Sequence, residues 1–102
     1  MHGCTIVLGY CLNYDENIKD LQRKGLKFKK DARETTFRDV EIVRDAEHAY
    51  LYIPFWQEYR DSSYESFPIN FDELSKLVQK VEALKSEGII PAAATFGVHT
   101  YH

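Results

Sequence analysis

The residues INFDELSKLVQKVEALKSEG, 69–88, carry the strongest structural signal of this chain. They predict an amphipathic helix over 71–87. Asn70 can cap the N-terminus, Glu73 stands three residues later to complete a capping box, and Gly88 can end the helix. Apolar residues recur at spacings of three and four, which gives the helix one face that can be buried against a sheet. These residues are Leu74, Leu77, Val78, Val81 and Leu84.

The rest of the chain alternates between strand and helix patterns. Asn13 predicts the start of a second helix, with Glu16 completing its capping box and Gly25 ending it. Gly9 lies inside an apolar strand and predicts a bulge or a close backbone contact. Residues 36–53 are interpreted as a β-hairpin. Phe37 is out of phase with Val40 and Ile42, so a bulge or a short first segment is the alternative to one continuous strand over 36–43. The expected strands are 5–12, 26–29, 36–43, 49–53 and 92–101.

In this order the elements predict a single α+β domain over residues 1–102. We expect an antiparallel sheet with two helices on one face, and a ferredoxin-like (split βαβ) arrangement fits best. The two helix starts also resemble each other, because residues 13–16, NYDE, match residues 70–73, NFDE. Capping preferences explain this match by convergence, and an old duplication of a βαβ unit is the alternative.

The composition is that of a small globular protein. Of the 102 residues, 44% are hydrophobic, and the formal net charge is −3. No apolar run is long enough to span a membrane, and the N-terminus lacks the pattern of a signal peptide. We therefore expect a cytoplasmic protein with no membrane partner. Cys4 and Cys11 should be reduced, because on one strand they would lie about 23 Å apart.

No sequence pattern predicts an enzyme. A glycine-rich phosphate-binding loop is absent, and nothing near Cys4 or Cys11 in the sequence would activate a thiol. We expect no catalytic residue, no cofactor and no bound metal. A small enzyme or metal-binding protein is the second alternative, because His2, Cys4, His99 and His102 would come close if the first and last strands were neighbours. Residues three apart in a strand point to opposite faces, however, which separates His99 from His102.

The basic segment 23–33 favours a different class of protein. Its lysines and arginines could contact phosphates; they are Arg23, Lys24, Lys27, Lys29, Lys30 and Arg33. RNA-binding modules of the ferredoxin-like kind usually stack bases on exposed aromatic residues of the sheet, and Phe28 would point away from Lys27 and Lys29. A nucleic-acid-binding module is therefore the first alternative, and a solvated basic surface is the simpler interpretation.

The segment 55–68 is interpreted as a long loop between a strand and the helix that follows. Residues 55–67 contain five aromatic side chains, one arginine and three acids. Trp, Tyr and Arg dominate interface hot spots, and carboxylates attract basic partners. We therefore expect a small protein-interaction module, such as an inhibitor, immunity or regulatory protein, that binds a basic protein partner. The expected partner-binding residues are Trp56, Glu58, Tyr59, Asp61, Tyr64 and Glu65.

Two alternatives to this interpretation of 55–68 stay open. In the first, Phe55, Trp56 and Phe67 only cover one end of the core. In the second, an edge strand or this loop joins two copies of the chain in a homodimer.

Overall fold

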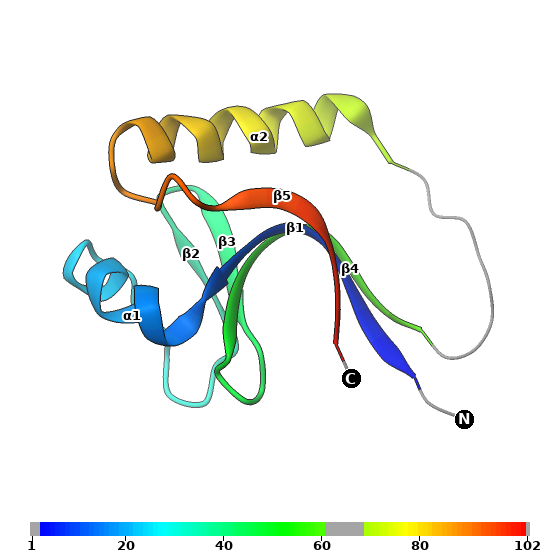
Figure 1. Cartoon of the computed structure of the whole chain (residues 1–102), viewed down its shortest axis with the longest axis horizontal. Helices are drawn as coiled ribbons and strands as arrows, with labels where there is room; N and C mark the ends of the chain where they lie inside the picture. The colour runs from blue at the N-terminus through cyan, green and yellow to red at the C-terminus, as the bar shows by residue number, and fades with distance from the viewer. Residues whose placement is uncertain (1–2, 61–68, 102) are drawn as a thin grey trace.

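The computed structural model of this chain describes residues 3–60 and 69–101 (Figure 1). Within these residues the fold is a small α+β arrangement, with a five-stranded antiparallel sheet and two helices. Neither of the two helices in the described part is long and apolar enough to cross a lipid bilayer. The elements are β1 (Cys4–Asn13), α1 (Tyr14–Arg23), β2 (Glu34–Phe37), β3 (Val40–Arg44), β4 (Tyr50–Arg60), α2 (Phe71–Ser86) and β5 (Thr95–Tyr101).

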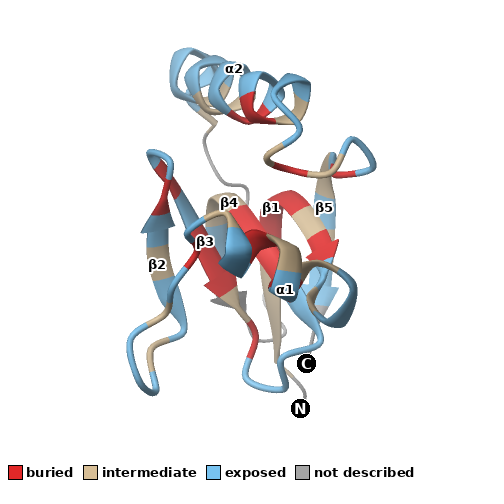
Figure 2. Cartoon of the chain, turned by 90° about the vertical axis from the view of Figure 1, so that its left-hand side faces the viewer, coloured by how far each residue is buried: buried red, intermediate tan, exposed pale blue. Residues whose placement is uncertain are grey.

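The sheet has the strand order β2-β3-β4-β1-β5, and each pair of neighbours is antiparallel. The apolar strand β1 lies between β4 and β5, as its composition predicts. One cluster of buried side chains forms the core. Both helices contribute to it, α1 through Ile18 and Leu21 and α2 through Val81 and Leu84. Figure 2 colours the buried residues red and shows α2 lying over the sheet.

Both predicted helix starts are confirmed, each with an asparagine at the cap. The Asn70 side-chain oxygen accepts hydrogen bonds from the backbone N–H groups of Asp72 at 3.0 Å and Glu73 at 3.2 Å. In the same way, Asn13 accepts from the backbone N–H of Glu16 at 3.0 Å. Each cap satisfies N–H groups that have no partner within the helix. Local chemistry therefore determines where both helices begin.

The bulge expected near Gly9 is also confirmed. The register between β1 and β4 shifts between Leu8, which lies opposite Trp56, and Gly9, which lies opposite Pro54. Phe55 is therefore an extra residue in β4 without a residue opposite it in β1. A bulge bends its strand and changes the direction of the side chains at that point.

The structure divides the strand predicted over 36–43 in two, and Phe37 lies in a short first segment, which was the alternative. The chain reverses at Arg38 and Asp39, and β2 pairs with β3, with Phe37 opposite Val40. Both turn residues have positive φ, 53° and 65°, which is typical of the two-residue type I′ turn that joins twisted strands. Phe37 is out of phase with the residues that follow because it belongs to a separate strand.

The segment from Leu26 to Lys29 was predicted to be a strand, and this is wrong. The alternation itself is present, because Leu26 is buried and Phe28 half-buried, whereas Lys27 and Lys29 are exposed. Among the described residues, however, the segment has no strand as a hydrogen-bonding neighbour. The Thr35 hydroxyl instead donates a hydrogen bond of 2.9 Å to the carbonyl oxygen of Lys27.

The prediction of a loop over 55–68 is wrong for its first part. β4 continues through Pro54 to Arg60 and stays paired with β1 along that length. Proline cannot donate a backbone hydrogen bond, so within sheets it is tolerated at edges and bulges. Pro54 lies at the bulge, which explains why the strand does not end there. Residues 61–68 lie outside the described residues.

β3 and β4 are paired over a short length only. Val43 lies opposite Tyr52 and Arg44 lies opposite Leu51, and the described residues show no further pairing between these two strands. Past Tyr52, therefore, β4 follows β1 while β3 leads into its hairpin with β2. This separation shapes the site described next.

Candidate partner-binding groove

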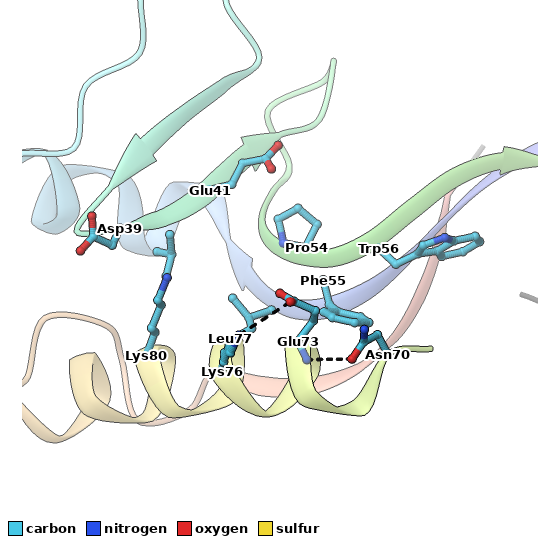
Figure 3. Close-up of a pocket in the computed structure, with 11 residues that line it drawn as sticks. Asp39, Glu41, Pro54, Phe55, Trp56, Asn70, Glu73, Lys76, Leu77 and Lys80 are labelled. Atoms are coloured by element: carbon cyan, nitrogen blue, oxygen red, sulfur yellow. Dashed lines mark hydrogen bonds and ion pairs between the residues drawn. The ribbon is translucent and has the colours of Figure 1, made fainter. Parts of the chain in front are cut away.

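A groove of about 530 Å³ lies between α2 and the separating strands β3 and β4 (Figure 3). Three segments line it: the β2–β3 turn and the start of β3, the bulged part of β4, and the first half of α2. The lining residues are Asp39, Val40, Glu41, Pro54, Phe55, Trp56, Asn70, Glu73, Lys76, Leu77 and Lys80.

The uneven burial of α2 explains why the groove opens at this end of the helix. Val81 and Leu84, in the second half of the helix, are buried in the core. Leu74, Leu77 and Val78, in the first half, are only partly buried. The sheet therefore covers the apolar stripe of α2 completely at one end and incompletely at the other.

Aromatic side chains of β4 supply apolar surface in the groove. Phe55 is the extra residue of the bulge, and in Figure 3 its ring lies between β4 and the first turns of α2. Trp56 follows it and is half-buried. Leu77 lines the groove from α2. This combination can accept an apolar side chain of another molecule.

Acidic residues line the sheet side of the groove. Asp39 lies in the type I′ turn and Glu41 on β3, where it is a diagonal neighbour of Glu34 on β2. Within residues 3–60 and 69–101, none of these three carboxylates forms an ion pair. Burial raises the pKa of Glu41 above its usual value, and a hydrogen bond and charge repulsion from Glu34 raise it further. The neighbouring Glu34 thus disfavours the negative charge of Glu41.

Two lysines lie on the helix side of the groove. The Lys76 ammonium is 3.8 Å from the Glu73 carboxylate, a long and exposed ion pair that contributes little to stability. Lys80 lies one turn further along α2 and is also exposed. The groove therefore has charges of both signs, with the carboxylates lacking ion pairs on the sheet side.

Of the six residues expected to bind a partner, Trp56 lines this groove. Glu58 and Tyr59 lie in β4, opposite Ile6 and Thr5 of β1, rather than in a loop. Glu58 is exposed. The other three residues of the expected set, Asp61, Tyr64 and Glu65, lie outside the described residues.

Most of the groove was not found by sequence reasoning. Asp39 and Glu41 were assigned to a continuous strand, and Lys76 and Leu77 were assigned only to a helix. The change of phase at Phe37 indicated a bulge or a short first segment, but it did not indicate that the chain reverses there. Residues 37–40, FRDV, place two polar residues between apolar ones, as a two-residue reversal requires.

The basic segment 23–33 takes part in the fold. The Lys24 ammonium donates hydrogen bonds to the Asp20 carboxylate at 2.6 Å and to the Gly88 carbonyl oxygen at 2.8 Å. It therefore connects the end of α1 to the end of α2. The hydrogen bond from Lys24 and the one from Arg23 hold the pKa of the Asp20 carboxyl group below its usual value. Lys27 is exposed and lies in the segment 26–29, which has no strand structure.

Among the described residues, Cys11 and His99 do not come together as a thiol–imidazole pair. Cys4 and Cys11 are both free, as predicted. Val7 lies opposite His99 and four residues from Cys11, which places the Cys11 and His99 positions about 13 Å apart along the strand. Burial, and to a lesser degree the charge of Asp45, raise the pKa of the Cys11 thiol, which disfavours the reactive thiolate.

The four residues considered for metal binding are only partly described. His2 and His102 lie outside the described residues. Strand alternation places Cys4 and His99 on opposite faces of the sheet, because Val7, opposite His99, is three residues from Cys4. In the part of the chain that the structure describes, no group of three or more His, Cys, Asp or Glu side chains could hold a metal ion.

Comparison with known proteins gives no relative from which a role could be transferred. No protein-family model, no curated protein and no solved structure matches this chain. A function must therefore be argued from the chemistry of the groove itself.

Proposed function

We propose that this chain is a small protein-interaction module that binds a basic segment of a partner protein in the groove under α2. The observation that carries the proposal is the meeting of an apolar wall with carboxylates that have no ion pair in the described residues. Phe55 and Trp56 would contact an apolar side chain of the partner, while Asp39 and Glu41 would receive a lysine or arginine.

The aromatic part of the groove supports this proposal through the physics of interfaces. Binding energy in protein complexes concentrates in a few residues, among which tryptophan is enriched. Trp56 is the only tryptophan of the chain and lies at the groove. A stable monomer gains most from an aromatic side chain when it is buried, so a half-buried tryptophan in a groove suits a surface that a partner completes.

The carboxylates that line the groove indicate that the partner segment is positively charged. Glu41 lines the groove, and its diagonal neighbour Glu34, outside the groove lining, repels its negative charge. A cation placed between such carboxylates would favour their charged forms and strengthen binding. The lysines of α2 on the other wall would disfavour partners whose basic residues extend in that direction. We therefore propose a partner segment with one apolar anchor and an adjacent lysine or arginine.

Three finer features go with this proposal. A ferredoxin-like relationship is supported by the order β3-β4-β1-β5 and by a core shared by both helices, with β2 as an addition at the edge. A cytoplasmic location is supported by the two free cysteines. The role of an inhibitor or regulator is supported by the proposed binding of a protein.

The proposal can be tested with peptides selected from a random-sequence display library on the purified protein. We expect the selected peptides to combine an aromatic or large aliphatic residue with a nearby lysine or arginine. Synthetic copies should change the intrinsic fluorescence of Trp56 on binding. Their affinity should fall as salt is added, because part of it is electrostatic.

Matched variants locate the binding site. Glu41→Gln and Asp39→Asn remove charge at the groove with little change in shape, and each should weaken peptide binding several-fold. Glu47→Gln removes a charge from an exposed turn outside the groove and should leave the affinity unchanged. Peptides without basic residues, or equal effects of the groove and control variants, would overturn the proposal.

A further inference from the structure

β5 is a long strand at one edge of the sheet. In the described part of the chain its only neighbour is β1, so the backbone N–H and C=O groups on its other side have no strand to pair with. Figure 2 shows β5 at the side of the sheet opposite β2. The Val98 side chain, in the middle of the strand, is 63% exposed. Such an edge is a template for pairing with another strand.

The composition of β5 differs from that of the opposite edge. β2 is four residues long and begins with Glu34, directly after Arg33. A short strand with charged residues resists pairing with other chains. β5 has seven residues and contains no Asp, Glu, Lys, Arg or Pro. Only one edge of this sheet therefore carries features that prevent association.

β1 gives the internal comparison for β5. It also lacks Asp, Glu, Lys, Arg and Pro, and it has a strand on each side. Strands covered on both sides can dispense with charge, because no solvated edge has to be protected from pairing. β5 also lacks charged residues and proline, but among the described strands it has a neighbour on one side only. The difference suggests that a second neighbour comes from outside the described chain.

We infer that two copies of this chain pair through β5, antiparallel and about a two-fold axis near Val98, so that their sheets become continuous. The second copy is the occupant that the sequence of β5 suits. Two strands without Asp, Glu, Lys or Arg approach each other without charge repulsion. The axis places Val98 opposite Val98 of the other copy, Gly97 opposite His99, and Phe96 opposite Thr100. An isologous contact of this kind closes after two copies and does not grow further.

This surface is separate from the proposed groove. In the strand order, β1 lies between β5 and β4, which is the nearest strand that lines the groove. A dimer formed through β5 would therefore leave both grooves available. The two proposals can fail independently, because one is tested by the oligomeric state and the other by peptide binding.

The first test is sedimentation velocity of the wild-type protein over a wide concentration range. We expect a reversible monomer–dimer equilibrium. Val98→Lys places two ammonium groups opposite each other at the axis and should weaken dimerisation on the order of tenfold or more, since like charges directly opposite each other are destabilising. Thr36→Lys makes a matched change on the exposed edge strand β2 and should leave dimerisation unchanged. Circular dichroism checks that both variants are folded.

The second test fixes the register of the two strands. Residues opposite each other at the axis have Cα atoms about 4.5 to 5.5 Å apart, which is within disulfide range. Val98→Cys should therefore form a disulfide with its own copy under mild oxidation, and mass spectrometry should find residue 98 linked to residue 98. Thr36→Cys should form no such link above background. A protein that stays monomeric at all concentrations, or a dimer that Val98→Lys does not weaken, would overturn the inference.

Discussion

Replacement of Gly9 by alanine tests the central strand most directly. A Cβ atom at this position would lie 2.3 Å from the Ile53 carbonyl oxygen and 2.8 Å from the Pro54 Cα atom. Ordinary contacts between carbon and oxygen are about 3.3 to 3.6 Å, so the backbone would have to move by roughly 1 Å. Both contacts are to backbone atoms of the paired strand β4, so no side-chain rotation can relieve them.

The loss in the free energy of unfolding caused by Gly9→Ala can be estimated. Overpacking of a well-packed interior typically costs about 1 to 3 kcal/mol and occasionally more. We expect Gly9→Ala to lie at or above the upper end, about 3 kcal/mol, because it displaces the strand pairing itself. For a domain of this size each 1 kcal/mol lowers the melting temperature by roughly 4 to 8 °C. The melting temperature should therefore fall by about 12 °C or more in a thermal denaturation followed by circular dichroism.

Two other glycines serve as controls for this experiment. Gly88 has a φ of 74° but no atom within 4 Å of an added Cβ, so alanine there should cost about 1 to 2 kcal/mol through backbone strain alone. Gly97 has ordinary space and no positive φ, so alanine there should be close to neutral. If Gly9→Ala destabilises the protein no more than Gly97→Ala does, the close approach of the β4 backbone is not the reason that position 9 requires glycine.

Three further predictions concern stability. Asn70→Ala removes the cap of α2 and should lower the free energy of unfolding by about 1 kcal/mol in urea denaturation. Lys24→Met removes the bond to the Gly88 carbonyl oxygen and should cost about 1 kcal/mol, measured in the same way. Glu41 has a raised pKa in the folded state, so it favours folding at low pH, and this contribution is lost as the pH rises through that pKa. Glu41→Gln should therefore be slightly stabilising at neutral pH, by about 0.5 kcal/mol or less because the site is solvated. This stabilisation should disappear at low pH, where Glu41 is protonated.

The features that could be predicted from the sequence are those determined by neighbouring residues. The cap at Asn70 needs only a side-chain oxygen and the next N–H groups, so it was predicted correctly. The bulge at Gly9 was predicted because glycine inside an apolar strand is typical of a bulge or of a close approach by another backbone segment. In both cases the residue type itself indicates the local structure.

The features that could not be predicted depend on partners distant in sequence. The alternation from Leu26 to Lys29 correctly indicated which side chains are buried, but burial by other elements produces the same pattern as a strand. β4 was expected to end at Pro54, and it continues because the bulge opposite Gly9 accommodates a residue without an N–H group. The groove itself exists because β3 leaves β4 after Tyr52, and no local pattern reports where two strands separate.

Glu41 connects the stability of this chain to its proposed function. If Glu41 served the fold, its replacement by glutamine would weaken both folding and peptide binding. If it serves a basic partner, the same variant should raise the stability of the free protein at neutral pH and lower its affinity for selected peptides. A variant that raises the stability and lowers the affinity identifies a residue that destabilises the fold but contributes to binding. Urea denaturation and Trp56 fluorescence titrations on the one variant measure both quantities, and a change of the same sign in both would refute the assignment of Glu41 to the partner.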